Sequence, residues 1–426
     1  METVNNKTEY EQAVLVGIDS GDAAECEISV AELRRLLDTA GGCCAAVMIQ
    51  QRRTPDPKTC IGSGKLKELK DLCKSCEAQL CVFDCELSPS QIKNIEDALD
   101  GVSVIDRSML ILDIFAAHAV TAEGKLQVAL AQLKYTAPRL IGKGKDMSRL
   151  GGGIGTRGPG ESQLETDRRH LKRREASLTA ALRELETQRR TTRSSRDRSG
   201  IPRAAIVGYT NAGKSTLLNR LTDAGILAED KLFATLDPTT RKFTLPGGEA
   251  VLLTDTVGFI RNLPHHLIKA FSSTLEEAAT ADIVIIVVDA SDPDHPSQLA
   301  VTRNLLEELG AGAKPTLIVY NKCDCFADSL PDETMNAAGT EGAVFVSALT
   351  GEGIDSLNEG LTRLVRAGRR RETWKIPQSD AGLVSTLYRD ADVESVDYGP
   401  EYITVTASAD ARVRGIMSKY RSVSDD

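Results

Sequence analysis

Short apolar runs alternate with amphipathic segments over the first hundred residues. Four of these runs predict buried strands, at residues 13–16, 45–49, 80–83 and 102–105. Between the first two, Ser29 and Glu32 have the spacing of a capping box, so we expect a helix to begin there. Gly41 and Gly42 would end it. Strands alternating with helices favour a parallel α/β domain over residues 1–107.

The pattern becomes helical from residue 108 to about residue 140, and leucines recur every seven residues between positions 164 and 185. We expect residues 108–193 to form an antiparallel helical hairpin with a glycine-rich loop at 151–160. That loop is either a hinge or, through Arg157, an RNA contact that becomes ordered on binding. The many Arg and Lys residues of the second helix are either a solvated face or a contact to an RNA backbone.

Residues 194–200 are polar and predict a linker to a second α/β domain at 201–372. There, apolar strands at 204–207, 281–289, 316–320 and 343–346 alternate with helices, which favours a mostly parallel sheet with helices on both faces. Ligands of such sheets bind at the carboxyl ends of the strands. Residues 373–426 predict a small α+β domain, with strands at 384–388 and 402–406 and a helix at 412–420.

Composition narrows the class of protein. The chain has 426 residues, 41% of them hydrophobic, and a net charge of -9, which fits a multidomain globular protein better than a general nucleic-acid coat. Neither a signal segment nor a membrane-length apolar run is evident, so we expect a cytoplasmic protein without membrane insertion. We also expect a monomer. The ten cysteines are interpreted as thiols, and those at 73, 76, 81 and 85 as buried apolar residues in preference to a zinc site.

One segment has the pattern of a phosphate-binding loop, G-x-x-x-x-G-K-[ST], between a strand and a helix. Its residues are Gly208, Tyr209, Thr210, Asn211, Ala212, Gly213, Lys214 and Ser215. Backbone N–H groups of such a loop surround phosphate oxygens, the lysine neutralises the outer phosphates, and the Ser215 hydroxyl coordinates Mg²⁺. The motif predicts a nucleoside triphosphate without specifying the base.

Three later segments complete a nucleotide site. The first is Asp255, Thr256, Val257 and Gly258; Asp255 could hold Mg²⁺ through water, and the Gly258 N–H could reach a γ-phosphate. The second is Asn321, Lys322, Cys323 and Asp324, whose carboxylate can accept two hydrogen bonds from guanine but none from adenine. The third is Ser347, Ala348 and Leu349, which offers a backbone N–H to the guanine carbonyl. Together they predict a GTPase of the translation-factor class.

Longer segments make the resemblance more specific. Residues 233–241 and 255–261 resemble the two switch segments of the HflX family of ribosome-associated GTPases. Residues 62–66, 127–135 and 151–161 resemble other segments of the same family. The first switch includes Phe233, Ala234, Thr235, Leu236 and Asp237. The resemblance implies a GTPase that binds the large ribosomal subunit in its GTP form and splits stalled ribosomes.

The resemblance also implies roles for single residues. Thr235 would join Ser215 on Mg²⁺, with Thr239 and Thr240 as rivals in the same segment. Phe259 stands where many GTPases carry a water-orienting glutamine, so we expect slow intrinsic hydrolysis that the ribosome stimulates, and no catalytic side chain is assigned. Asn211 matches a position that binds K⁺ in some related GTPases.

Two other functions remain open. One is a metabolic P-loop enzyme such as a small-molecule kinase, against which Asp324 argues because it selects guanine. The other is an RNA-remodelling or scaffold protein with an incidental GTPase, which the basic helix keeps open. The segment at 62–65 is too short for a phosphate loop and is interpreted as a turn into a helix, with an RNA contact or a weak second nucleotide site as alternatives.

Overall fold

The computed structural model describes residues 12–147, 159–197, 201–222, 232–233, 236–262, 264, 272–326, 342–409 and 411–422. The chain divides into two compact units. The first comprises residues 1–185, 227–237 and 257–275, and the second comprises 186–226, 238–256 and 276–426.

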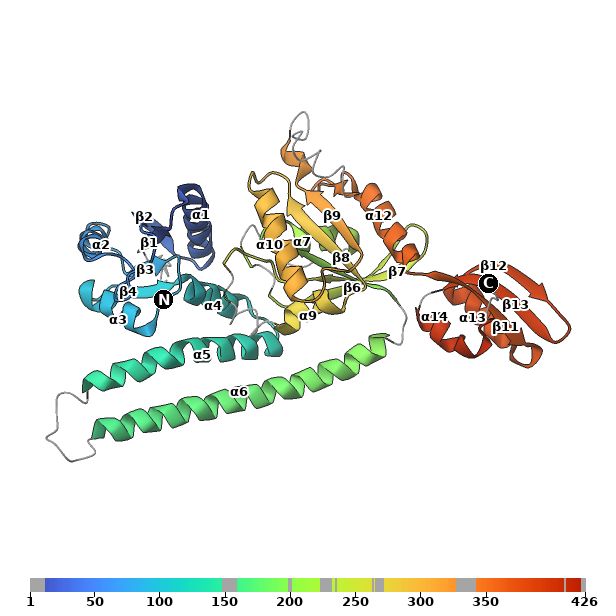
Figure 1. Ribbon diagram of the computed structural model, residues 1–426, viewed down its shortest axis with the longest axis horizontal. Helices are drawn as coiled ribbons and strands as arrows, with labels where there is room; N and C mark the ends of the chain where they lie inside the picture. Colours follow the sequence, from blue (N-terminus) through green and yellow to red (C-terminus); the bar gives the residue numbers. More distant parts are fainter. Residues whose placement is uncertain are drawn as a thin grey trace, which may run out of the picture. The chain divides into compact units, whose positions relative to one another are not determined.

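The first unit begins with a parallel sheet in the order β2-β1-β3-β4 (Figure 1). Its strands are β1 (Gln12–Asp19), β2 (Cys43–Gln51), β3 (Leu80–Phe83) and β4 (Ser103–Asp106). Its helices are α1 (Ala23–Thr39), α2 (Ser63–Ser75) and α3 (Pro89–Ala98). Alternate residues of β1 and β3 pack with α2 and α3 into one core, which confirms the predicted parallel α/β domain.

Two local predictions have different outcomes. Gly62 is the residue before α2, so the interpretation of 62–65 as a turn into a helix is confirmed. The predicted capping box is wrong, because α1 already begins at Ala23 and Asp22 caps it by accepting from the Glu25 N–H at 3.0 Å. Ser29 and Glu32 lie within the helix, and both contact the buried Arg107 instead.

The helical region follows, as α4 (Arg107–His118), α5 (Ala122–Met147) and α6 (Pro159–Asp197). The single helix expected from residue 108 is therefore two, because Ala119 has an extended conformation. Lys134 of α5 forms an ion pair with Glu175 of α6 at 3.9 Å, and the two helices run side by side in Figure 1. Helix α6 continues through Asp197, so the linker expected from residue 194 is helical for most of its length. Residues 148–158, which include most of the glycine-rich segment, lie outside the described part.

The second unit contains a six-stranded sheet in the order β10-β9-β8-β5-β7-β6, in which β6 alone is antiparallel to its neighbour. The strands are β5 (Arg203–Gly208), β6 (Thr239–Thr244), β7 (Ala250–Asp255), β8 (Ile283–Asp289), β9 (Thr316–Asn321) and β10 (Val344–Phe345). The helices are α7 (Lys214–Thr222), α9 (Ser272–Thr280), α10 (His295–Glu308) and α12 (Ile354–Ala367), with a 3-10 turn at Cys323–Cys325.

Helices cover both faces of this sheet. Leucines of α7 and α12 pack with Val319 of β9 in one core. The neighbouring residue Tyr320 points to the other face, where its ring meets that of His295 on α10 at 5.9 Å between centroids. The structure thus has the predicted fold class, a mostly parallel P-loop sheet preceded by a parallel α/β domain and followed by an α+β domain.

The C-terminal domain is a three-stranded antiparallel sheet in the order β11-β13-β12. Its elements are β11 (Arg370–Pro377), α13 (Gly382–Asp390), β12 (Asp392–Tyr398), β13 (Tyr402–Ala409) and α14 (Ala411–Ile416), with 3-10 turns at Gln378–Asp380 and Ser418–Tyr420. The strand predicted at 384–388 is wrong, because these residues form α13. The predicted strand at 402–406 is confirmed within β13. No helix in the described part of the chain is both long and apolar enough to cross a membrane.

Candidate functional site

The loop between β5 and α7 has a backbone that only glycine fits well at two positions. Gly208 has φ +148°, and a Cβ there would lie 2.1 Å from the Val287 carbonyl oxygen on β8. Gly213 has φ +90°, and a Cβ there would lie 2.2 Å from Nδ2 of Asn321 on β9. Both glycines therefore let the loop cross the carboxyl end of the sheet at close range.

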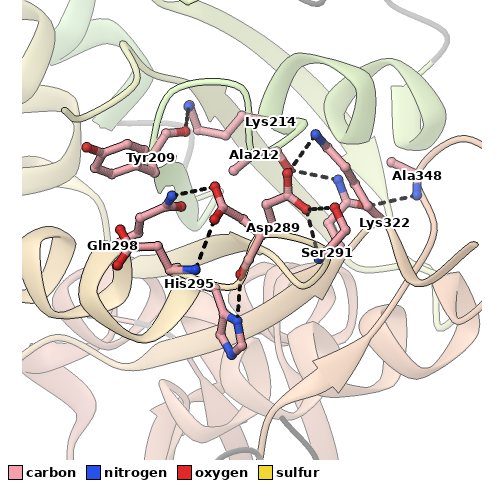
Figure 2. A network of polar contacts seen from close by, with 12 residues as sticks. Tyr209, Ala212, Lys214, Asp289, Ser291, His295, Gln298, Lys322 and Ala348 are labelled. Atoms are coloured by element: carbon pink, nitrogen blue, oxygen red, sulfur yellow. Dashed lines mark hydrogen bonds and ion pairs between the residues drawn. The ribbon is translucent and has the colours of Figure 1, made fainter. Parts of the chain in front are cut away.

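Lys214 begins α7 with its side chain folded back over the loop. Its Nζ donates hydrogen bonds to the carbonyl oxygens of Gly208 at 3.2 Å and Tyr209 at 2.8 Å, and Figure 2 shows the side chain beside Tyr209. Burial lowers the pKa of Lys214 to about 8, although the negative charge of Asp255 opposes this shift. An anion bound beside this buried ammonium group would stabilise its charge.

Two oxygen groups meet beside this lysine. The Ser215 hydroxyl donates to Oδ2 of Asp255 at 2.6 Å, and Asp255 is fully buried at the end of β7. The next residue, Thr256, donates its hydroxyl to the Ile206 carbonyl at 2.7 Å, which ties β7 to β5. A hydroxyl and a carboxylate are the hard oxygen donors that Mg²⁺ prefers, so this pair fits the ion in its chemistry.

Asn321 links the phosphate loop to the segment after β10. Its Nδ2 donates to the Ala212 carbonyl at 2.8 Å, and its Oδ1 accepts from the Ala348 N–H at 2.9 Å. The Ser347 hydroxyl donates to Oδ1 of Asp324 at 2.5 Å, which fixes that carboxylate. The structure thus brings together three segments that the sequence predicts to share a site. Leu349 is 72% exposed, unlike Ser347 and Ala348 of the same segment, which are buried.

Lys322 has a partner that sequence reasoning missed. Its backbone is left-handed, with φ +65°, and its Nζ pairs with Oδ2 of Asp289 at 2.7 Å. The other oxygen of Asp289 accepts from the N–H and the hydroxyl of Ser291, at 3.0 and 2.6 Å, so the carboxylate is held from both sides (Figure 2). Asp289 is the last residue of β8, which lies next to β9 in the sheet. The feature of the sequence that could have identified it is an acidic residue at the carboxyl end of a buried strand.

After the ion pair between Asp289 and Lys322, a second group of contacts involves the start of α10. Gln298 donates to Oδ2 of Asp292 at 2.8 Å, and the His295 ring nitrogen Nδ1 lies 2.9 Å from the Asp292 carbonyl oxygen (Figure 2). These contacts hold the loop that carries Asp289 and Ser291. They support the site and take no direct part in it.

Residues 233–237 of the first switch segment belong to the first compact unit. Phe233 has φ +57° and is 3% exposed, and its ring meets that of Phe115 edge-on at 4.7 Å between centroids. Asp237 accepts from the N–H groups of Val120 and Thr121 at 2.9 and 2.8 Å, and also from the Thr121 hydroxyl. Leu236 is buried. These contacts join the switch to the turn between α4 and α5.

Two residues named from the sequence, Ala234 and Thr235, lie outside the described part of the chain. The proposed rivals of Thr235 are described, and they lie at the start of β6. There the Thr240 hydroxyl is 3.0 Å from that of Thr254 on β7, so it takes part in the sheet.

Residues 257–261 of the second switch segment also belong to the first unit. Val257 and Gly258 follow β7 and are buried, and Phe259 is only 1% exposed. The Arg261 carbonyl accepts from Nη2 of Arg107 at 3.3 Å. That buried guanidinium also pairs with Asp84 at 2.7 Å and with Glu32. Within the first unit, α4 and the turn after it thus contact the first switch, and Arg107 contacts the second, which the sequence did not reveal.

The fold and the site define the chain as a P-loop GTPase, and comparison with known families agrees. Residues 27–116 match the family "GTP-binding GTPase N-terminal", residues 118–196 match "GTP-binding GTPase Middle Region", and residues 203–322 match "50S ribosome-binding GTPase".

Similar proteins specify the family. The GTPase HflX of Lacrimispora saccharolytica is 48% identical over 406 residues, which cover 95% of each chain. That of Escherichia coli K12 is 42% identical over 384 residues, 90% of each chain. A GTP-binding protein from Sulfolobus solfataricus in complex with GDP, solved as a crystal structure, is 25% identical with a TM-score of 0.45, covering 83% of this chain and 98% of that one. The chain belongs to the HflX family of GTPases.

Proposed function

We propose that the protein binds GTP with Mg²⁺, binds the large ribosomal subunit in that form, and dissociates or rescues stalled ribosomes in the cytoplasm. Hydrolysis to GDP and phosphate then resets the switch. The observation that carries the nucleotide part is the position of Asn321, which ties the phosphate loop at Ala212 to the base-recognition segment at Ala348 through bonds of 2.8 and 2.9 Å.

In this proposal each part of the site has a separate role. Residues 208–215 surround the phosphates, and the buried ammonium group of Lys214 neutralises them. Asp324 accepts from guanine while Ser347 holds it, and Asp289 positions Lys322 beside the base. Residues 233–237 and 255–258 would respond to the γ-phosphate.

Mg²⁺ would be held by Ser215 and Thr235, with Asp255 acting through water. The ion neutralises charge on the β- and γ-phosphates when it is bound. The hydrogen bond from Ser215 to Asp255 supports this assignment, because it holds the hydroxyl in position next to a carboxylate. We also propose that Asn211 binds K⁺. The backbone at Asn211 is left-handed, with φ +63°, and turns the loop at that residue.

We propose slow intrinsic hydrolysis because Phe259 has no group that can orient water and is buried. A group supplied by the ribosome would complete the reaction. Lys214→Ala is expected to abolish nucleotide binding, and Asp324→Asn to shift preference from GTP toward xanthosine triphosphate, measured by equilibrium titration. Unchanged GTP affinity in the Asp324→Asn variant would contradict the base assignment.

The ribosome part is supported by the family and by a basic surface on α6. Its exposed cations include Arg168, Lys172, Arg173 and Arg174, within two turns of helix. Cations clustered in this way suit a phosphate backbone, and each lost phosphate contact lowers the salt dependence of binding by about one unit of log–log slope.

The test is co-sedimentation with purified large subunits, comparing a non-hydrolysable GTP analogue with GDP. We expect binding that requires the GTP form, followed by dissociation of intact ribosomes. Replacing Lys172 and Arg173 by Gln should weaken binding and reduce its salt dependence, while the control pair Arg370→Gln and Arg371→Gln, exposed on β11, should not. Equal binding in both nucleotide states would refute the ribosome-directed switch.

The basic face of α6 also favours a second function, an RNA-remodelling or scaffold protein whose GTPase is incidental. Binding of structured RNA that depends on Lys172 and Arg173 but ignores the nucleotide would favour that function. Binding confined to ribosomal subunits and to the GTP form would exclude it.

A further inference from the structure

Two cysteines that are 25 residues apart in the sequence meet in the N-terminal domain. Cys60 lies in the loop between β2 and α2, and Cys85 follows β3. Their sulfur atoms are 3.2 Å apart. Cys60 is 1% exposed, whereas Cys85 is only partly buried, so one residue of the pair is accessible from solvent.

The backbone on the Cys60 side is fixed. Asp56 and Cys60 exchange two backbone hydrogen bonds, of 2.7 and 2.9 Å, and Cys60 has φ +65°. Arg52 pairs with Asp56 at 3.1 Å, and Gln91 of α3 donates to the Asp56 carbonyl at 2.8 Å. The loop therefore presents the Cys60 sulfur to Cys85 in one defined conformation.

The two thiols differ in acidity because they share a hydrogen bond. The shared hydrogen bond lowers the pKa of Cys60, against the effect of burial, and raises the pKa of Cys85. The hydrogen bond thus stabilises a thiolate within the pair, and the thiolate is the form that reacts with oxidants.

We propose that Cys60 and Cys85 form an oxidisable dithiol that hydrogen peroxide or a related hydroperoxide converts into an intrachain disulfide. One sulfur of the pair, as the thiolate, attacks the O–O bond, which gives a sulfenic acid and, after proton transfer, one water molecule. The other sulfur then attacks the sulfenic sulfur, and the hydroxyl leaves with a proton as a second water. Two thiols are oxidised and one peroxide is reduced, so atoms and electrons balance.

Closing the bond requires the sulfurs to approach by roughly 1.2 Å, since a disulfide is about 2.05 Å long. The disulfide would join the loop before α2 to the end of β3. Cys85 is adjacent to Asp84, which pairs with Arg107 at 2.7 Å, so the bond would form next to the contact that reaches the second switch. The proposal does not depend on ribosome binding.

A second thiol pair in the same core provides an internal comparison. Cys73 on α2 and Cys81 on β3 share a hydrogen bond, but they are 2% and 0% exposed. Neither residue is therefore as accessible as Cys85. Cys43 is an exposed cysteine for which the structure describes no thiol partner, and it tests whether exposure alone decides reactivity.

The experiment treats the full-length protein with hydrogen peroxide, alkylates the remaining thiols and analyses the peptides by mass spectrometry without reduction. We expect a cross-linked peptide that joins Cys60 to Cys85, lighter by two hydrogen atoms and reversed by dithiothreitol. Of the ten cysteines, the other eight (ten minus two) should still be alkylated.

Three variants make the test specific. Cys60→Ser and Cys85→Ser should each abolish the cross-link, and Cys43→Ser should leave it unchanged. Thermal unfolding of the reduced variants checks that they are folded; if either serine variant is not, alkylation of the wild-type protein after graded peroxide doses decides. Loss of Cys43 before the pair, linkage of Cys73 to Cys81 instead, or continued alkylation of Cys60 and Cys85 would each overturn the proposal.

Discussion

Lys214 makes nucleotide binding depend on pH in a predictable direction. Burial lowers its pKa from 10.5 to about 8 without nucleotide. A bound triphosphate places negative charge beside the ammonium group and raises that pKa again. Binding therefore takes up protons, and affinity falls as pH rises through the pKa of the nucleotide-free protein.

The size of the effect follows from the pKa. With a value of about 8, the free protein lacks this proton in roughly a tenth of molecules at pH 7, half at pH 8 and three quarters at pH 8.5. Uptake per bound nucleotide should follow these fractions. Affinity should fall about fourfold between pH 7 and pH 8.5, since it scales with the protonated fraction.

Isothermal titration of GTP with Mg²⁺ in buffers of different ionisation enthalpy measures this uptake directly. Lys314 provides a matched control, because burial also lowers its pKa although it lies outside the proposed nucleotide site. Lys314→Met should therefore leave the proton uptake unchanged. Lys214→Arg keeps a charge that does not titrate in this range, so any binding it retains should occur without proton uptake. Uptake near zero at pH 8 in the wild-type protein would refute the reasoning.

Three further variants test the supporting contacts. Arg107→Ala removes a 3%-exposed cation from between the buried Glu32 and the partly buried Asp84. We therefore expect the free energy of unfolding to fall by about 3–5 kcal/mol, seen as faster amide exchange in β1 and β3. The control Arg371→Ala, at an ion pair whose arginine is 70% exposed, should lower it by less than about 1 kcal/mol. Asp289→Asn removes the ion pair that holds Lys322 and should weaken GTP binding by about tenfold in equilibrium titration; unchanged affinity would show that the pair does not position the lysine. Asp237→Ala removes two backbone hydrogen bonds before α5 and should speed amide exchange in the first turn of that helix by the equivalent of about 1–3 kcal/mol; unaltered exchange would mean that the switch does not stabilise it.

Short-range chemistry explains why much of the nucleotide site was predictable. The loop at 208–215 needs glycine where its backbone crosses β8 and β9, and a lysine and a hydroxyl at the start of the helix, so its sequence is strongly constrained. Asn321 and Asp324 likewise sit at the end of a buried strand. Parallel strands place such ends at one edge of the sheet, so the sequence alone indicated that these segments belong to one site.

Local patterns failed where several structures fit the same residues. Val384 and Leu387 are three residues apart and both buried, as one face of α13 requires, but the segment is short enough to resemble a strand. Ser29 and Glu32 resemble a capping box, but the same i,i+3 spacing lets both reach Arg107 from the middle of α1.

The amino-acid sequence by itself determined the fold class and the segments predicted to bind the phosphates and the base. Only the tertiary structure decided which distant groups meet: Asp289 with Lys322, Asp237 with the turn before α5, and Cys60 with Cys85. The physical reason is that a motif is fixed by the backbone of a few neighbouring residues. A long-range contact depends on how strands order themselves in a sheet and how helices pack on it, and no local pattern carries that information.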